Sequence, residues 1–183
     1  RQVVNSYYGV KLNANYDDAT FKFYVTGTYG DDYWKHITDQ VQPFIFLDIG
    51  ANQGLYTLCA SMNTNCIACF SFEPVSKTFA LLKKNVMVND YLTKCHLINK
   101  AITNKSGFYD ISIKPNHSGV ATMHPQNNLL NEANNNIETI EAISYIELDN
   151  LIKNNNKAKI IVKIDVEGFE MNVIKELLKT QVA

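Results

Sequence analysis

The stretch Pro43-Phe-Ile-Phe-Leu-Asp-Ile-Gly-Ala-Asn-Gln-Gly54 joins a short apolar run to a turn that contains glycine. Residues Pro43 to Ile49 have the composition of a strand buried on both faces, as in a parallel sheet covered by helices. After the turn, apolar residues recur at the spacing of one helix face: Leu55, Leu58, Cys59 and Met62. The stretch therefore predicts a strand, a tight turn and an amphipathic helix, the opening of an α/β fold.

The alternation of strands and helices continues toward the C-terminus. It predicts a strand at Ile67–Phe72, a helix capped by Ser76, strands at Cys95–Ile98 and Lys159–Asp165, and a helix whose apolar stripe begins at Phe169. Between the last two strands, residues 107–147 read as an antiparallel insert, in which Gly107–Ile113 forms a hairpin with Val120–Met123. The fold class is therefore α/β, a doubly wound, mostly parallel, Rossmann-like sheet with an antiparallel hairpin insert.

The length of 183 residues suits one domain. Within residues 1–183 we expect an irregular lead-in over 1–40, with a short strand at Thr20–Val25 and a helix at Tyr33–Val41. Residues 43–102 form the nucleotide-binding half, and residues 159–183 the last strand and helix. Because the chain opens on Arg1 and stops directly after a helical pattern, we interpret it as an excerpt of a longer protein, truncated before the last strands of its sheet.

Composition and charge exclude several classes of protein. A hydrophobic fraction of 46% and a charged fraction of 19% support a folded core. Lys+Arg 17 against Asp+Glu 18 offers no basic excess for nucleic acid, so a small molecule is the expected partner. No apolar run reaches the ~20 residues of a membrane span. The four cysteines, including the pair Cys66 and Cys69, are interpreted as buried reduced thiols, which together with the absence of an export signal favours a cytoplasmic location.

Three acidic residues stand at the ends of predicted parallel strands, where ligands bind in open α/β sheets. These are Asp48, Glu73 and Asp165. In the first loop, Gly50 and Gly54 permit a tight turn, and Asn52 tolerates unusual backbone angles. The free N–H groups of the next helix favour a carboxylate, and Asp48 can accept hydrogen bonds from an ammonium. The loop therefore suits an amino-acid zwitterion.

Glu73 predicts that the ligand also contains a nucleoside. It lies 25 residues after Asp48 at the end of the second strand, the place of an acidic residue that binds ribose hydroxyls. An amino acid joined to a nucleoside describes S-adenosylmethionine (SAM). The phosphate-binding pattern G-x-x-x-x-G-K-[ST] is absent, and Asn52 replaces the second glycine of G-x-G-x-x-G. A nicotinamide-dependent oxidoreductase and a non-catalytic SAM-binding module remain the alternatives.

The sequence resembles the FkbM family of SAM-dependent methyltransferases over roughly residues 20–180. The matching stretches are Leu47–Leu58, Phe72-Glu73-Pro74, Ile98–Ile102, Ile146–Asp149 and Val162-Lys-Ile-Asp-Val-Glu-Gly-Phe-Glu170. The resemblance implies a class I methyltransferase fold and methyl transfer to a hydroxyl oxygen of a sugar or another small metabolite. By the same resemblance, SAM is contacted by Asp48, Gly50, Asn52, Gly54 and Glu73, and Ala101 lies near its adenine.

Asp165-Val166-Glu167-Gly168 forms the acceptor half of the expected site. We expect Asp165 to face the methyl group or the acceptor, and Glu167 to act as a general base, or alternatively to cap the next helix. No third ligand for a metal accompanies this carboxylate pair, so no metal is expected. His117 and His124 are further candidate bases. The aromatic residues Tyr29, Tyr33 and Trp34 either cover the cofactor or pack on the sheet, and packing is the preferred interpretation.

Overall fold

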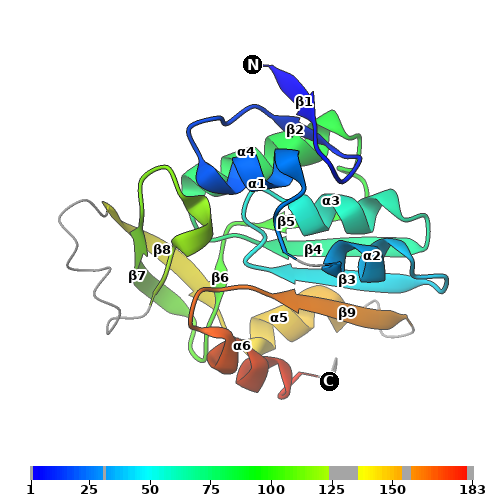
Figure 1. Ribbon diagram of the computed structural model, residues 1–183. Helices are drawn as coiled ribbons and strands as arrows, with labels where there is room; N and C mark the ends of the chain where they lie inside the picture. The colour runs from blue at the N-terminus through cyan, green and yellow to red at the C-terminus, as the bar shows by residue number, and fades with distance from the viewer. Residues whose placement is uncertain (1, 31, 124–135, 154–157, 181–183) are drawn as a thin grey trace.

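A four-stranded parallel sheet forms the centre of the computed structural model, which describes residues 2–30, 32–123, 136–153 and 158–180 (Figure 1). Its strands are β3 (Phe44–Ile49), β4 (Cys66–Phe72), β5 (Cys95–Ile98) and β9 (Lys159–Ile164), in the order β5-β4-β3-β9. Ile49 pairs with Phe72 on one side and with Ile164 on the other, so β3, β4 and β9 end at the same edge. The predicted parallel α/β sheet is confirmed.

Helices cover both faces of this sheet (Figure 1). Phe44 and Phe46 of β3 pack into one core with α3 (Leu55–Met62) and α4 (Ser76–Val88). The alternate residues Ile45 and Leu47 pack into a second core with α5 (Tyr145–Ile152) and α6 (Glu170–Leu177). Because successive side chains of a strand point to opposite faces, the apolar side chains of β3 are buried on both faces of the sheet, as in a doubly wound fold.

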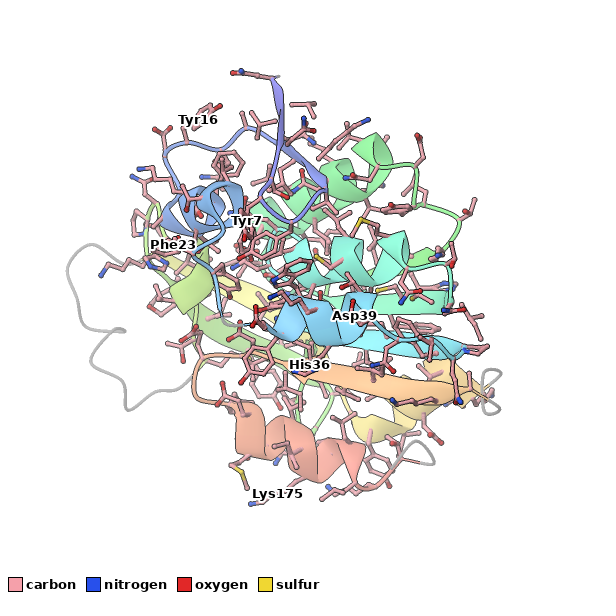
Figure 2. All side chains as sticks on the ribbon, turned by 45° about the vertical axis from the view of Figure 1, so that its right-hand side comes forward. Tyr7, Tyr16, Phe23, His36, Asp39 and Lys175 are labelled. Atoms are coloured by element: carbon pink, nitrogen blue, oxygen red, sulfur yellow. The ribbon has the colours of Figure 1, made fainter. Side chains whose placement is uncertain are left out.

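The described part of the lead-in over residues 1–40 is more regular than predicted, and the helix predicted at Tyr33–Val41 is confirmed at Tyr33–Thr38. It contains the antiparallel pair β1 (Val3–Asn5) and β2 (Lys11–Asn13) and the helices α1 (Ala19–Thr26) and α2 (Tyr33–Thr38). Its apolar side chains join the core on the α3 side of the sheet: Tyr8, Val10, Leu12, Phe21, Tyr24 and Ile37. Tyr7, Tyr16 and Phe23 stay exposed on its outer surface (Figure 2). This segment therefore completes one covering layer.

The strand predicted at Thr20–Val25 is wrong, because these residues lie in helix α1. The side chain of Asp18 accepts a hydrogen bond from the backbone N–H of Phe21 and caps the first turn. Gly27 ends the helix in the left-handed conformation that glycine adopts without strain. Phe21 and Tyr24 are three residues apart and both buried, which is one helix face. Two caps and a helical spacing outweigh the β-forming composition of the segment.

The insert pairs with β6 in a second, three-stranded sheet of the order β6-β8-β7. Its strands are β6 (Ala101–Ile102), β7 (Gly107–Ile113) and β8 (Asn136–Ile143), and β7 pairs with β8 in antiparallel fashion. An antiparallel insert is thus confirmed, but its predicted second strand, Val120–Met123, contributes only an isolated bridge between Ser112 and Thr122. Ser118–Val120 is a 3-10 helix, and β8 supplies the apolar side chains that pack on β7.

All four cysteines are buried free thiols, as predicted. Burial raises the pKa of Cys59 to about 12 and the pKa of Cys66 to about 11. Among the described helices, none combines the length and the apolar character that crossing a membrane requires. Much of the predicted polar loop at Gln126–Asn136 lies outside the described residues.

Candidate functional site

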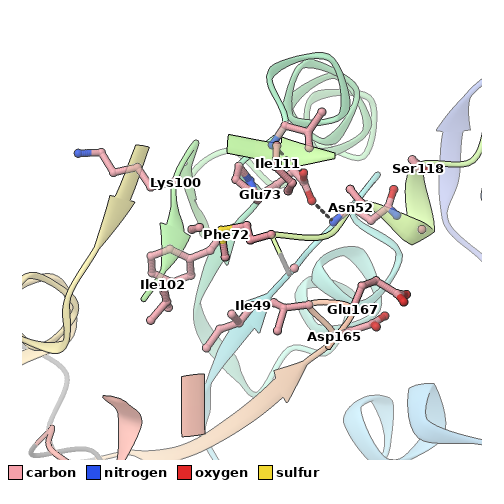
Figure 3. A pocket seen from close by; sticks show the side chains of 18 residues that line it. Ile49, Asn52, Phe72, Glu73, Lys100, Ile102, Ile111, Ser118, Asp165 and Glu167 are labelled. Carbon is pink, nitrogen blue, oxygen red and sulfur yellow. Dashed lines mark hydrogen bonds between the residues drawn. The ribbon is translucent and has the colours of Figure 1, made fainter. Parts of the chain in front are cut away.

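A pocket opens where β3, β4 and β9 end, at the edge predicted to bind a ligand (Figure 3). Most of the residues predicted for the site line it: Gly50, Asn52, Glu73, Ala101, Asp165 and Glu167. They come from the loops after β3, β4 and β9 and from β6, segments that are far apart in the sequence. The fold therefore brings both halves of the predicted site to one cavity.

Glu73 is the polar centre of this pocket. One carboxylate oxygen accepts the backbone N–H of Asn52 at 2.8 Å, and the other accepts the N–H of Val75 at 2.9 Å. The Asn99 side chain donates to the carbonyl oxygen of Glu73 at 2.8 Å and so fixes its backbone. Burial raises the pKa of Glu73 to about 7, although the two amide donors oppose this shift. A rigidly held carboxylate thus faces the cavity between the glycine loop and β4.

One part of the pocket wall is apolar. Phe72, Ile102 and Ile111 line it beside Ala101 (Figure 3). Phe72 ends β4, and Ile111 reaches the pocket from the second sheet. A flat aromatic base would fit against such side chains while its polar substituents reach the neighbouring carboxylate. An apolar wall beside a hydrogen-bond acceptor is a combination that suits a nucleoside.

The two loop glycines make room for other parts of the protein. Gly50 has φ +76°, and a Cβ there would lie 1.9 Å from the backbone oxygen of Asp165. Gly54 has φ +94°, and its Cβ would lie 2.5 Å from Leu82 of α4. Asn52 also adopts a left-handed conformation, with φ +51°. Gly50 lines the pocket and Gly54 does not, so contact of Gly54 with a ligand stays a prediction.

Asp48 is placed beneath the pocket rather than in its lining. Its side chain has no exposed surface, and one carboxylate oxygen accepts the Thr57 hydroxyl at 2.7 Å. The other carboxylate oxygen lies 3.3 Å from the ammonium nitrogen of Lys163. A protein cation thus lies beside Asp48, and contact of Asp48 with a ligand stays a prediction.

Asp165 is half-buried at the end of β9, with a side-chain exposure of 38%. Its Oδ2 accepts the Tyr29 hydroxyl at 2.9 Å and lies 3.7 Å from Lys163 Nζ. Burial and the neighbouring charge of Asp165 raise the pKa of Tyr29 well above its usual value. Sequence reasoning missed both partners. Lys163 precedes Asp165 by two residues, so strand alternation places it on the same face, whereas the contact of Tyr29 depends on tertiary structure alone.

Glu167 stands exposed at the rim of the pocket. Partial loss of water around its carboxyl raises its pKa, and the nearby charges of Asp165 and Glu170 raise it further. Capping of the next turn falls to Glu170, whose carboxylate accepts the backbone N–H groups of Gly168 at 3.0 Å and Val166 at 3.4 Å. Within the part of the chain that the structure describes, the Glu167 carboxylate accepts no hydrogen bond and remains available to a ligand.

The remaining candidates lie away from this pocket. His117 precedes the 3-10 helix and does not line the cavity, while His124 lies outside the described residues. Trp34 packs edge-to-face on Tyr8 at 5.6 Å between ring centroids, and Tyr33 is exposed. In residues 2–30, 32–123, 136–153 and 158–180, no three His, Cys, Asp or Glu side chains gather as a metal site.

Comparison with known proteins identifies the family. The Methyltransferase FkbM domain matches residues 48–182, a range that contains both halves of the pocket. The Methyltransferase sdnD of Sordaria araneosa is 30% identical over 93 residues. That match covers 50% of this chain and 36% of the length of the relative, so the chain corresponds to part of that protein.

Solved structures offer distant, partial likenesses. A SAM-dependent methyltransferase from Agrobacterium tumefaciens matches with 13% identity and a TM-score of 0.33, over 37% of this chain and 21% of that one. TYW2 of Methanocaldococcus jannaschii in complex with AdoMet matches with 10% identity and a TM-score of 0.37, over 62% and 64%. The tRNA m1G37 methyltransferase of the same organism has 12% identity and a TM-score of 0.37, over 61% and 42%. On the match over residues 48–182, the chain belongs to the FkbM family of SAM-dependent methyltransferases.

Proposed function

We propose that this chain transfers the methyl group of SAM to a hydroxyl oxygen of a sugar or another small metabolite. The observation that supports this most directly is the single pocket shared by Glu73, Asn52, Asp165 and Glu167. A nucleoside-binding carboxylate and a pair of further acidic groups are thereby brought to one cavity. A cofactor and an acceptor would meet in this space.

In this proposal the cofactor half holds the nucleoside. The Glu73 carboxylate accepts hydrogen bonds from the ribose hydroxyls, since each of its oxygens keeps a lone pair beyond the one used by the backbone amides. Ala101 and the apolar wall of Phe72, Ile102 and Ile111 bind the adenine. Gly50 and Asn52 present loop backbone to the amino-acid end. Asp48 holds the loop through Thr57 and Lys163, and Gly54 lets it approach Leu82 closely.

The acceptor half supplies orientation and a base. When bound, SAM supplies an activated methyl group, so the protein has mainly to align the acceptor oxygen with it. Asp165, fixed by Tyr29, holds the acceptor hydroxyl. Glu167 takes the hydroxyl proton, because partial dehydration and two neighbouring carboxylates make it a stronger base than a free carboxylate. Its exposure at the rim then lets this proton leave to water.

Binding measurements test the cofactor half. Isothermal titration of the purified chain with SAM, S-adenosylhomocysteine and NAD should give binding of the first two only. Glu73→Ala should abolish this binding while leaving the protein folded, and Glu138→Ala is a matched control, because Glu138 also accepts a backbone N–H, that of Ser76, outside the pocket. Binding of NAD in place of SAM would contradict the proposal and favour an oxidoreductase.

A labelling experiment tests the acceptor. The chain would be incubated with SAM carrying a labelled methyl group and with separate metabolite, lipid, protein and RNA fractions, and the labelled product analysed by mass spectrometry. The proposal expects an O-methyl group on a small metabolite, lost when Glu167 is replaced by Gln. A labelled nitrogen atom, or label confined to RNA or protein, would contradict the proposed acceptor class.

A further inference from the structure

A largely buried cation, Lys163, connects the two halves of the site outside the pocket lining. Lys163 lies on β9, and its ammonium donates a hydrogen bond of 2.6 Å to the backbone oxygen of Gly50. The same nitrogen is 3.3 Å from Asp48 Oδ1 and 3.7 Å from Asp165 Oδ2. Only 17% of the side chain is exposed, and it does not line the pocket. Lys163 thus contacts the end of β3, the glycine loop and the acceptor-side carboxylate without reaching the cavity.

The groups around Lys163 leave it little freedom. Asp48 is fully buried and held by Thr57, while Asp165 is held by Tyr29. The ring of Tyr56 lies 5.6 Å from the ammonium nitrogen, at a distance where a cation is attracted to an aromatic face. Ionised groups in such surroundings require a partner, because a buried charge without one is costly. The position of Lys163 and the positions of both carboxylates therefore depend on one another.

We infer that Lys163 is a positioning residue for the proposed methyl transfer, with Asp48 as its counter-ion. It fixes the carbonyl of Gly50, and hence the glycine loop, relative to Asp165. The groups that bind the cofactor and those that bind the acceptor are thereby held in a fixed relative position. The inference rests on the proposed function. It also assigns Asp48 to the protein's own cation.

Lys159 offers a matched control on the same strand. It lies four residues before Lys163 and is exposed, and its ammonium donates to the Gln40 side chain, away from the pocket. Lys159→Gln removes the same charge and the same length of side chain from β9 without touching the cluster. A change that follows Lys163→Gln but not Lys159→Gln therefore reports on the contacts of Lys163.

The experiment measures the affinity for SAM and S-adenosylhomocysteine by isothermal titration, together with the thermal midpoint, for the chain and its variants. We expect Lys163→Gln to lower both affinities by at least about tenfold, Lys159→Gln to leave them within about twofold, and Lys163→Arg to recover most of the loss because it keeps the charge. The backbone amide resonances of Gly50 and Asn52 should shift in Lys163→Gln and not in Lys159→Gln.

A double variant separates positioning from folding. Lys163→Gln alone leaves the Asp48 carboxylate buried without its cation, so this variant is expected to be less stable. Asp48→Asn with Lys163→Gln removes both charges and should recover the thermal midpoint but not the affinity. Wild-type affinity in a folded single or double variant, or no recovery with Arg, would overturn the inference. Failure of the unaltered chain to bind either ligand would instead overturn the proposed function, and this inference with it.

Discussion

The backbone N–H of Asn52 donates a 2.8 Å hydrogen bond to the carboxylate of Glu73 and so joins the glycine loop to the end of β4 (Figure 3). Burial raises the pKa of Glu73 to about 7, whereas ribose hydroxyls bind best to the ionised form. We predict that the affinity for SAM rises as the pH increases from 6 to 8. Isothermal titration across this range measures the effect. In Glu73→Gln, affinity should be at least about tenfold lower and independent of pH. A pH-dependence that persists in this variant would assign it to another group.

The same carboxyl makes stability depend on pH in the ligand-free protein. Its folded pKa of about 7 lies above the usual value of 4.5, so between these values the folded chain holds a proton that the unfolded chain has lost. The stabilisation that comes from this tighter proton binding is complete below pH 4.5 and is lost as the pH rises through 7. We predict a loss on the order of 2 kcal/mol in the free energy of unfolding between pH 5 and 8. Urea titrations of the wild type and Glu73→Gln at several pH values would check this. An equal change of the unfolding free energy with pH in both proteins would contradict it.

Gly50→Ala should be strongly destabilising, because the new Cβ would lie 1.9 Å from the backbone oxygen of Asp165. Gly9→Ala is the matched control: Gly9 has φ +80°, close to the +76° of Gly50, but its Cβ would meet only Met62, at 4.0 Å. Backbone strain alone predicts a loss of about 1 kcal/mol at Gly9, and the added clash more than about 3 kcal/mol at Gly50. Similar unfolding free energies for the two variants would show that β9 can move away from the loop.

Asn85 ties the N-terminal segment to the loop through a fully buried side chain. It accepts the backbone N–H of Asn13 at 2.7 Å and donates to the carbonyl oxygen of Gln53 at 2.8 Å. We predict that Asn85→Ala lowers the free energy of unfolding by about 2–3 kcal/mol, since a buried and a partly buried backbone group lose their partners. Asn89→Ala removes two exposed bonds to Lys11 and a part-buried one to the Asn85 carbonyl oxygen, and should cost less than Asn85→Ala. Equal losses in denaturant titrations would contradict this account.

The thiols should be inert in the folded protein. All four are buried, and burial raises the pKa of Cys59 and Cys66, which suppresses the reactive thiolate. Hydrogen bonds from Cys69 and Ser61 lower the pKa of Cys95, but its burial still denies access to a reagent. A disulfide reagent such as DTNB should therefore label no thiol at a rate faster than local opening, and should label four in denaturant. Rapid labelling of the native chain would contradict this prediction.

The sequence predicts the central sheet well because β3, β4 and β9 carry apolar runs that end in turn residues. These signals are local, and tertiary contacts reinforce them. The N-terminal segment was harder to predict because α1 has an aromatic, β-branched composition, and only Asp18 and Gly27 mark its ends. β7 pairs with β8 and packs against its residue Ile140. This pairing is long-range, so the turn motif near Pro115 could not predict it.

The candidate site divides in the same way. Strand ends and a glycine loop indicate where ligand-facing groups gather, and the pocket is lined by Glu73, Asp165 and Glu167. The sequence does not show which carboxylates already have partners. Asp48 and Asp165 look alike as acidic residues after strands, yet one is sealed beneath the loop with Lys163 and the other faces the cavity. That distinction depends on tertiary structure, as does the hydrogen bond from Tyr29 to Asp165.

The close approach of Gly50 to the Asp165 backbone also bears on when the site can form. In the sequence, the strands of the second sheet lie between the loops that carry these two residues, so no local segment of the chain can reproduce their contact. During synthesis the glycine loop leaves the ribosome long before Asp165 does, and it lacks its neighbour until β9 docks beside β3. The complete pocket is consequently formed only after the long-range pairing of β9 with β3.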